Sequence, residues 1–223
     1  MHKGKTKYMS NYEDHNTITI ENEKIEKVQS YKYLGKTIFL KDTTKEEVTC
    51  RIRAGWSCFG RNREIFMDNN MPLSLKKQVF DQCILPTITY GCQTWSLTKN
   101  LANKLRVAQR AMERKMLNLK VKDKVPCKEI RERTGLKDVV EFAERQKWKW
   151  AGHIARAKDN RWTRRVTEWQ PRTGKRSRGR QLTRWRDSIV REKGPLWHRE
   201  AQNRMKWRLD VEGYILQWMD TAL

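Results

Sequence analysis

Ten tryptophans occur in a chain whose 49 lysines and arginines far outnumber its 26 aspartates and glutamates, which gives a formal net charge of +23. Disordered chains are poor in large aromatic residues because they have no core in which to bury them, so the tryptophans predict a folded protein. The charge adds a second constraint, since a compact chain this basic repels itself unless a polyanion is bound nearby. The phosphates of a nucleic acid would neutralise this positive charge. The composition therefore favours nucleic-acid binding over a surface that is basic only for solubility.

The sequence shows no sign of a membrane-spanning, secreted or metal-binding protein. No run approaches 18 apolar residues, and no apolar stretch follows the basic first residues. We therefore expect a soluble intracellular protein, with nucleus and cytoplasm not distinguished, and an anionic membrane surface remains the weaker alternative partner. The five cysteines are odd in number and include no C-x-x-C pair, which argues against disulfides and zinc. No metal or other cofactor is expected.

Residues typical of catalytic motifs are also missing from the sequence. It contains no G-x-x-x-x-G-K-[ST], G-x-S-x-G or H-E-x-x-H pattern. Two-metal phosphoryl transfer needs clustered carboxylates, yet the sequence has no Asp-Asp pair. His153 has no evident base or nucleophile beside it in the sequence, so a structural role is the simpler interpretation. We therefore expect no independent enzyme.

The spacing of apolar residues changes from a strand pattern to a helix pattern near residue 43. Alternation around Glu21-Asn22-Glu23 predicts a hairpin, and residues 31–39 would add strand pairing. From residue 43 onward, apolar residues recur at steps of three and four, most clearly over 101–119 and again over 139–157. The sequence thus predicts a mostly helical α+β fold, with short N-terminal strands, a helical bundle and a basic helical C-terminal region.

A glycine-spaced basic run at 171–180 is the favoured site of phosphate contact, with a merely solvated loop as the alternative. The predicted contacts in and after this loop are Arg172, Lys175, Arg176, Arg178, Arg180, Arg184 and Arg186. A second set lies on the basic face of the long helix and comprises Arg106, Arg110 and Arg114.

The run Lys147-Trp148-Lys149-Trp150 opens a region in which cations and flat aromatic rings alternate up to residue 208. Lysines can neutralise phosphates and indoles can stack on unpaired bases, so Lys147 and Lys149 are further predicted contacts. For any one tryptophan the simpler interpretation is a core residue whose basic neighbours reach solvent. Whether these indoles stack on bases or fill the core remains open at this point.

Several motifs, in their order along the chain, resemble the C-terminal part of a non-LTR (LINE-type) retrotransposon reverse transcriptase, closest to the RTE-like group. The matching segments cover essentially the whole chain, and their order makes coincidence a poor explanation. They are Lys5-Thr6-Lys7-Tyr8-Met9, Tyr31-Lys32-Tyr33-Leu34-Gly35, Arg51-Ile52 with Trp56 and Phe59, Leu85-Pro86, Tyr90-Gly91-Cys92-Gln93-Thr94-Trp95, the helix Gln109-Arg110-Ala111-Met112-Glu113-Arg114-Lys115-Met116-Leu117, the segment from Trp148 to Arg156, and Gly179-Arg180 with Arg184-Trp185.

The resemblance implies a division into three regions. Residues 1–42 would be a remnant of the palm and primer-grip strands, in which Lys5 lies near the nucleotide phosphates and Tyr33, Leu34 and Gly35 position the primer end. Residues 43–135 would form a helical thumb-like domain that grips the template–primer duplex. Residues 136–223 would form a basic, tryptophan-rich region, with the flexible loop 171–180, that holds template RNA or target DNA.

The resemblance also implies limits on the activity. Relatives carry an endonuclease, fingers and a palm with a Tyr-Ala-Asp-Asp-type metal motif, and this sequence lacks all of these. We therefore expect a fragment that binds RNA, DNA or their hybrid through phosphate contacts without catalysis. Two alternatives stay open. The chain could complete a reverse transcriptase in trans with a palm-containing partner, or it could be a decayed, non-functional product that folds poorly.

Overall fold

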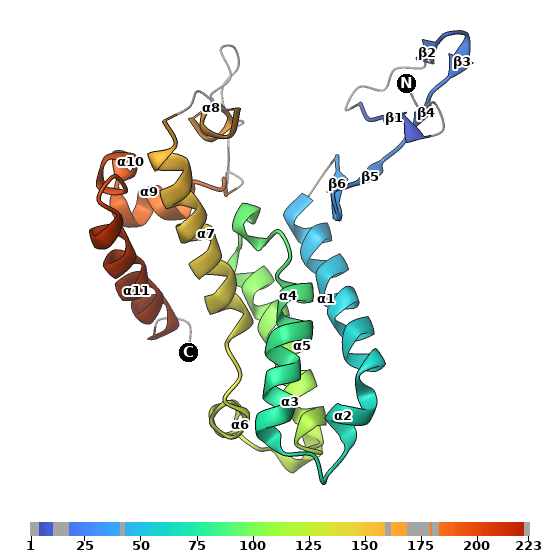
Figure 1. Cartoon of the computed structure of the whole chain (residues 1–223), viewed down its shortest axis with the longest axis vertical. Coiled ribbons are helices and arrows are strands. Elements are labelled where there is room, and N and C mark those ends of the chain that lie inside the picture. Colours follow the sequence, from blue (N-terminus) through green and yellow to red (C-terminus); the bar gives the residue numbers. More distant parts are fainter. Residues whose placement is uncertain are drawn as a thin grey trace.

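The computed structural model describes residues 5–10, 18–40, 43–158, 162–168, 179 and 183–220. Short strands at the N-terminal end extend away from a helical body, and the C-terminal helices lie along one long helix of that body (Figure 1). The expected mostly helical α+β class is confirmed. Within the described part of the chain, no helix is both long and apolar enough to cross a membrane.

The N-terminal strands form three separate two-stranded pairs. The hairpin predicted around Glu21-Asn22-Glu23 is confirmed, and φ angles of 50° at Glu21 and 64° at Asn22 give the left-handed turn that a two-residue hairpin favours. The pairs are β2 (Thr19–Ile20) with β3 (Glu23–Lys24) and β5 (Ser30–Tyr33) with β6 (Lys36–Phe39), both antiparallel, and β1 (Lys7–Tyr8) with β4 (Glu26–Lys27), which is parallel.

The helices after residue 43 enclose a first hydrophobic core. They are α1 (Thr43–Arg61), α2 (Arg63–Met67), α3 (Leu73–Val79), the π-helical turn η2 (Phe80–Ile84), α4 (Leu85–Ile88), the 3-10 turn η3 (Cys92–Thr94), α5 (Lys99–Met116), the 3-10 turn η4 (Val121–Asp123) and α6 (Cys127–Thr134). The apolar stripe of α5 supplies Leu101, Leu105, Met112 and Met116 to this core, because residues three and four apart share one helix face.

A second core lies beside the first and is built on α7 (Val139–Arg156). The start of α7 packs into the first core through Val139 and Ala143, whereas its later part places Trp148 in the second. The remaining helices are α8 (Trp162–Glu168), α9 (Asp187–Lys193), α10 (Trp197–Glu200) and α11 (Arg204–Asp220). Helix α7 therefore stands between the bundle and α11, as Figure 1 shows.

Candidate nucleic-acid interface

The basic face predicted on α5 is largely engaged in pairs within the protein. Arg110 is 6% exposed, and its guanidinium pairs with Glu113 and, at 3.3 Å, with Asp138. Arg106 lies 3.7 Å from the same Asp138 carboxylate. Arg114 is half-buried on the same helix. The structure therefore corrects the prediction for Arg110, because a buried guanidinium held by two carboxylates is not available to a phosphate.

The two lysines of α7 that are predicted to contact phosphate differ sharply in burial. Lys147 is buried and its Nζ donates a hydrogen bond to Ser188 Oγ at 2.8 Å, which ties α7 to α9. Burial lowers the pKa of Lys147, although the carboxylates of Glu144 and Asp187 oppose that shift. The side chain of Lys149, two residues on, is exposed. The prediction of a phosphate contact is thus corrected for Lys147, whose ammonium is enclosed, and continues to hold as a prediction for Lys149.

The residues predicted to position a primer end form the tight turn between β5 and β6. Leu34 and Gly35 have φ angles of 48° and 77°. The Tyr90 hydroxyl donates a hydrogen bond to the Leu34 carbonyl at 2.7 Å, and Arg51 donates to the Gly35 carbonyl. The turn is therefore fixed against α1 and against Tyr90, which follows α4, while the side chains of Tyr33 and Leu34 are exposed. Their role toward a primer stays a prediction, as does that of the exposed Lys5.

The basic loop falls mostly outside the described residues, so the predictions made for it stay predictions. These are Arg172, Lys175, Arg176, Arg178 and Arg180. Arg184 and Arg186 are described, the first exposed and the second half-buried, just before α9.

A groove between α7 and α11 gathers cations that sequence reasoning did not combine. Its volume is about 390 Å³. We call it the cationic groove and define it by Lys149, His153 and Arg156 on α7 with Arg204 and Arg208 on α11. The spacing on each helix is three or four residues, so each set lies on one face. That spacing is visible in the sequence, but only the packing of α7 against α11 brings the two faces together.

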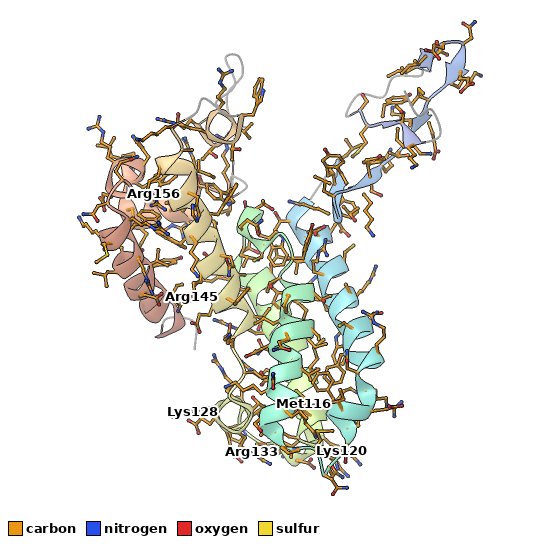
Figure 2. The ribbon with its side chains drawn as sticks, in the orientation of Figure 1. Met116, Lys120, Lys128, Arg133, Arg145 and Arg156 are labelled. Carbon is orange, nitrogen blue, oxygen red and sulfur yellow. The ribbon has the colours of Figure 1, made fainter. Side chains whose placement is uncertain are left out.

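The positive charge of the cationic groove is poorly neutralised by carboxylates of the protein. Among the described residues that line it, Glu212 is the one carboxylate, and it pairs with Arg145. Figure 2 shows Arg145 in the first half of α7 and Arg156 at the other end of the helix. Burial first, and the neighbouring Arg204 guanidinium second, lower the pKa of Arg156. A bound anion would relieve this repulsion between like charges.

The close packing of α7 on α11 depends on Gly152, which follows the cationic Lys149 by one helical turn. A Cβ at this position would lie 2.7 Å from Trp207 Nε1 and 2.8 Å from Trp207 Cδ1. That indole N–H donates a hydrogen bond to the Trp148 carbonyl at 3.0 Å. A glycine inside a helix is unfavourable by propensity, so the close approach of Trp207 is the physical reason for it here.

The variant Gly152→Ala is expected to lower the free energy of unfolding by about 1–3 kcal/mol, because the added methyl group must displace the Trp207 indole. Urea denaturation followed by circular dichroism measures this change. Gly213→Ala on α11 is the matched control, since a Cβ there meets nothing within 4 Å, and it should leave stability unchanged or raise it slightly. Equal stabilities for the two variants would contradict the tight packing described above.

Comparison with known proteins gives one informative match. No protein-family model matches the chain, and no solved structure matches it significantly. A Caenorhabditis elegans protein described as the uncharacterized transposon-derived protein F52C9.6 is 32% identical over 172 residues, which cover 75% of this chain and 61% of that protein. The matched region thus spans about three-fifths of the length of the relative. The chain is accordingly similar, over most of its length, to a protein described as transposon-derived.

Proposed function

We propose that this protein binds nucleic acid through phosphate contacts in the cationic groove. The observation that carries the proposal is the convergence of Lys149, Arg156, Arg204 and Arg208 around a hollow whose one described carboxylate already pairs with Arg145. Guanidinium and ammonium groups are the protein's strongest partners for phosphate, and each contact releases counterions from the nucleic acid. The net charge of +23 supports the same partner through long-range attraction.

We further propose that the chain is a retrotransposon product that corresponds to the thumb and later part of a reverse transcriptase. The order of its motifs and the transposon-derived description of its relative support this origin. In this proposal α1 to α5 would form a thumb against template–primer, and the region from α7 onward would hold template RNA or target DNA. The sequence carries no palm-type metal motif, so binding without DNA synthesis is the proposed activity of the chain alone.

The variant Arg204→Glu/Arg208→Glu tests the cationic groove. Fluorescent RNA, duplex DNA and RNA–DNA hybrid are titrated with the full chain at several salt concentrations. We expect affinity for the bound ligand to fall by about 10-fold or more, and the slope of log K against log salt to flatten by about 2, because two phosphate contacts are lost.

A matched control separates the groove from net charge alone. Lys128→Glu/Arg133→Glu makes the same charge change on α6, whose labelled side chains lie far from Arg156 (Figure 2). Both control residues are exposed, and their reversal should weaken binding only slightly. Equal losses for the two double variants, or no binding by the wild type, would overturn the proposal.

Completion of a polymerase in trans remains the second candidate function. The observation that favours it is the β5–β6 turn, where the predicted primer-positioning residues are fixed to the helical body through Tyr90 and Arg51. A docked turn of this kind could offer a formed surface to a separate palm. The two functions differ in one outcome, since only this one yields DNA synthesis when the chain is mixed with a palm-containing reverse transcriptase.

A further inference from the structure

A second groove lies at a neighbouring face of the later part of α7 and is lined mainly by aromatic and apolar side chains. Its volume is about 530 Å³, within the range typical of ligand pockets. We call it the aromatic groove and define it by Trp150 on α7, Trp162 and Val166 on α8, and Arg184, Trp185 and Arg186 before α9. It therefore combines three indoles with two guanidinium groups.

Two of the three indoles of the aromatic groove, those of Trp150 and Trp162, differ in exposure from the four tryptophans that are buried in the two cores. Trp95, Trp148, Trp197 and Trp207 are all buried, as expected of core residues. In contrast, Trp162 is 74% exposed and Trp150 is 38% exposed. A folded protein exposes such large flat rings together mainly where something binds. Some tryptophans therefore fill the cores, whereas Trp150 and Trp162 are exposed enough to contact a ligand.

The third indole of the groove is held in place. Trp185 Nε1 donates a hydrogen bond to the Gln93 carbonyl at 2.7 Å, which fixes the ring against η3. The Lys147 Nζ lies 5.8 Å from the centre of the same ring. On α8 the Arg165 guanidinium lies 5.4 Å from the centre of the Trp162 ring. The groove thus combines a fixed indole, that of Trp185, with a largely exposed one, that of Trp162.

A third hollow lies at the end of α7, between residues that line the aromatic groove and a residue that lines the cationic groove. Its volume is about 480 Å³, and its lining includes Ala157, Lys158 and Arg164. It shares Trp150 and Ile154 with the aromatic groove and His153 with the cationic groove. The three hollows therefore follow one another around the end of α7, along a path with aromatic residues at one end and cationic residues at the other.

We propose that this path binds single-stranded nucleic acid, with unpaired bases stacked in the aromatic groove and the backbone phosphates running on into the cationic groove. This inference rests on the proposed function and names its ligand class. Bases in a duplex are stacked on their own neighbours, so only a single strand can present a base face to an indole. Arg184 and Arg186 at the aromatic end supply the charge complement for the phosphates that accompany those bases.

The variant Trp162→Ala tests the inference. A fluorescent 20-nucleotide single strand and a duplex of the same length are titrated with the full chain. Stacking on an indole contributes about 1–3 kcal/mol per base, so we expect affinity for the single strand to fall by about 5- to 100-fold while duplex affinity changes little. Trp162→Phe keeps a flat ring and should retain most of the affinity. Because Trp162 is mostly exposed, neither variant is expected to unfold the chain.

Two comparisons make the outcome decisive. Leu209→Ala removes another exposed apolar side chain, from α11 and outside the residues lining either groove, and should leave single-strand affinity unchanged. If Trp162→Ala weakens binding of the single strand and the duplex equally, or of neither, while Arg204→Glu/Arg208→Glu still weakens binding, stacking in the aromatic groove is overturned and the phosphate proposal survives. If the wild type binds no nucleic acid, the proposed function itself fails and this inference fails with it.

Discussion

Replacing Asp138 by alanine is expected to lower the free energy of unfolding by about 3–5 kcal/mol, because a buried carboxylate is lost from among arginines that stay behind. Its Oδ2 lies 3.3 Å from Arg110 and 3.1 Å from Arg131, and its side chain has no exposed surface. Its Oδ1 accepts backbone hydrogen bonds from Val140 and Glu141, which caps the start of α7. One side chain therefore balances the buried charge between α5 and α6 and fixes where α7 begins.

Urea denaturation measures the effect of Asp138→Ala. Two further variants separate the contribution of the charge from that of the helix cap and provide a surface control. Asp138→Asn keeps an oxygen that can cap α7 but removes the charge, so its loss of stability should be intermediate. Glu129→Ala removes an exposed carboxylate that lies 3.7 Å from Arg133, and surface pairs of this kind contribute about 0–1 kcal/mol. If Asp138→Ala lowers the free energy of unfolding no more than Glu129→Ala does, the stability of the fold does not depend on the ion pairs of Asp138.

Replacing Trp148 by alanine is also expected to lower the free energy of unfolding by about 3–5 kcal/mol, because the side chain is fully buried in the second core. Its ring centre lies 5.3 Å from that of Trp207 and 4.6 Å from that of Tyr214. Loss of this ring removes the main apolar contact between α7 and α11. The cationic groove between those helices should be lost with it, and nucleic-acid affinity should fall in parallel.

Thermal melting followed by near-ultraviolet circular dichroism checks the Trp148 variant. We expect the C-terminal helices to melt at a lower temperature than the first core, whose buried residues do not include Trp148. Trp150→Ala, two residues along the same helix, is the matched control, because Trp150 is 38% exposed. That control should lower the melting temperature much less than Trp148→Ala, because a large part of its ring already faces solvent. A Trp148→Ala variant that melts like Trp150→Ala would show that the second core does not depend on this ring.

The helices and the first hairpin could be predicted from the sequence because their signals are local. The stripe on α5 recurs every three or four residues, and the hairpin turn needs only two residues that accept positive φ angles. The helical spacing that begins near residue 43 does not mark one boundary, since the structure separates α1 from α2 at Asn62. The same local reasoning located the basic and tryptophan-rich character of the C-terminal region.

The tertiary structure decided which of the basic residues are exposed to a ligand. Arg110 and Lys147 looked like exposed cations in the sequence, yet their partners Asp138 and Ser188 lie 28 and 41 residues further along the chain. Gly152 is likewise explained only by Trp207, whose indole lies 2.7 Å from where a Cβ at that position would be. Such pairings depend on how α5, α7, α9 and α11 pack, and no spacing within one helix encodes them.

The sequence by itself thus determined a folded, mostly helical and strongly basic chain, because helical periodicity and net charge are properties of neighbouring residues and of composition. Only the tertiary structure decided which cations remain open to a ligand and which indoles lie at the surface. The physical reason is that burial and ion pairing are set between segments far apart in the chain: Trp148 is enclosed by Trp207 on α11, while Trp150, on the other side of the same helix, lines a groove.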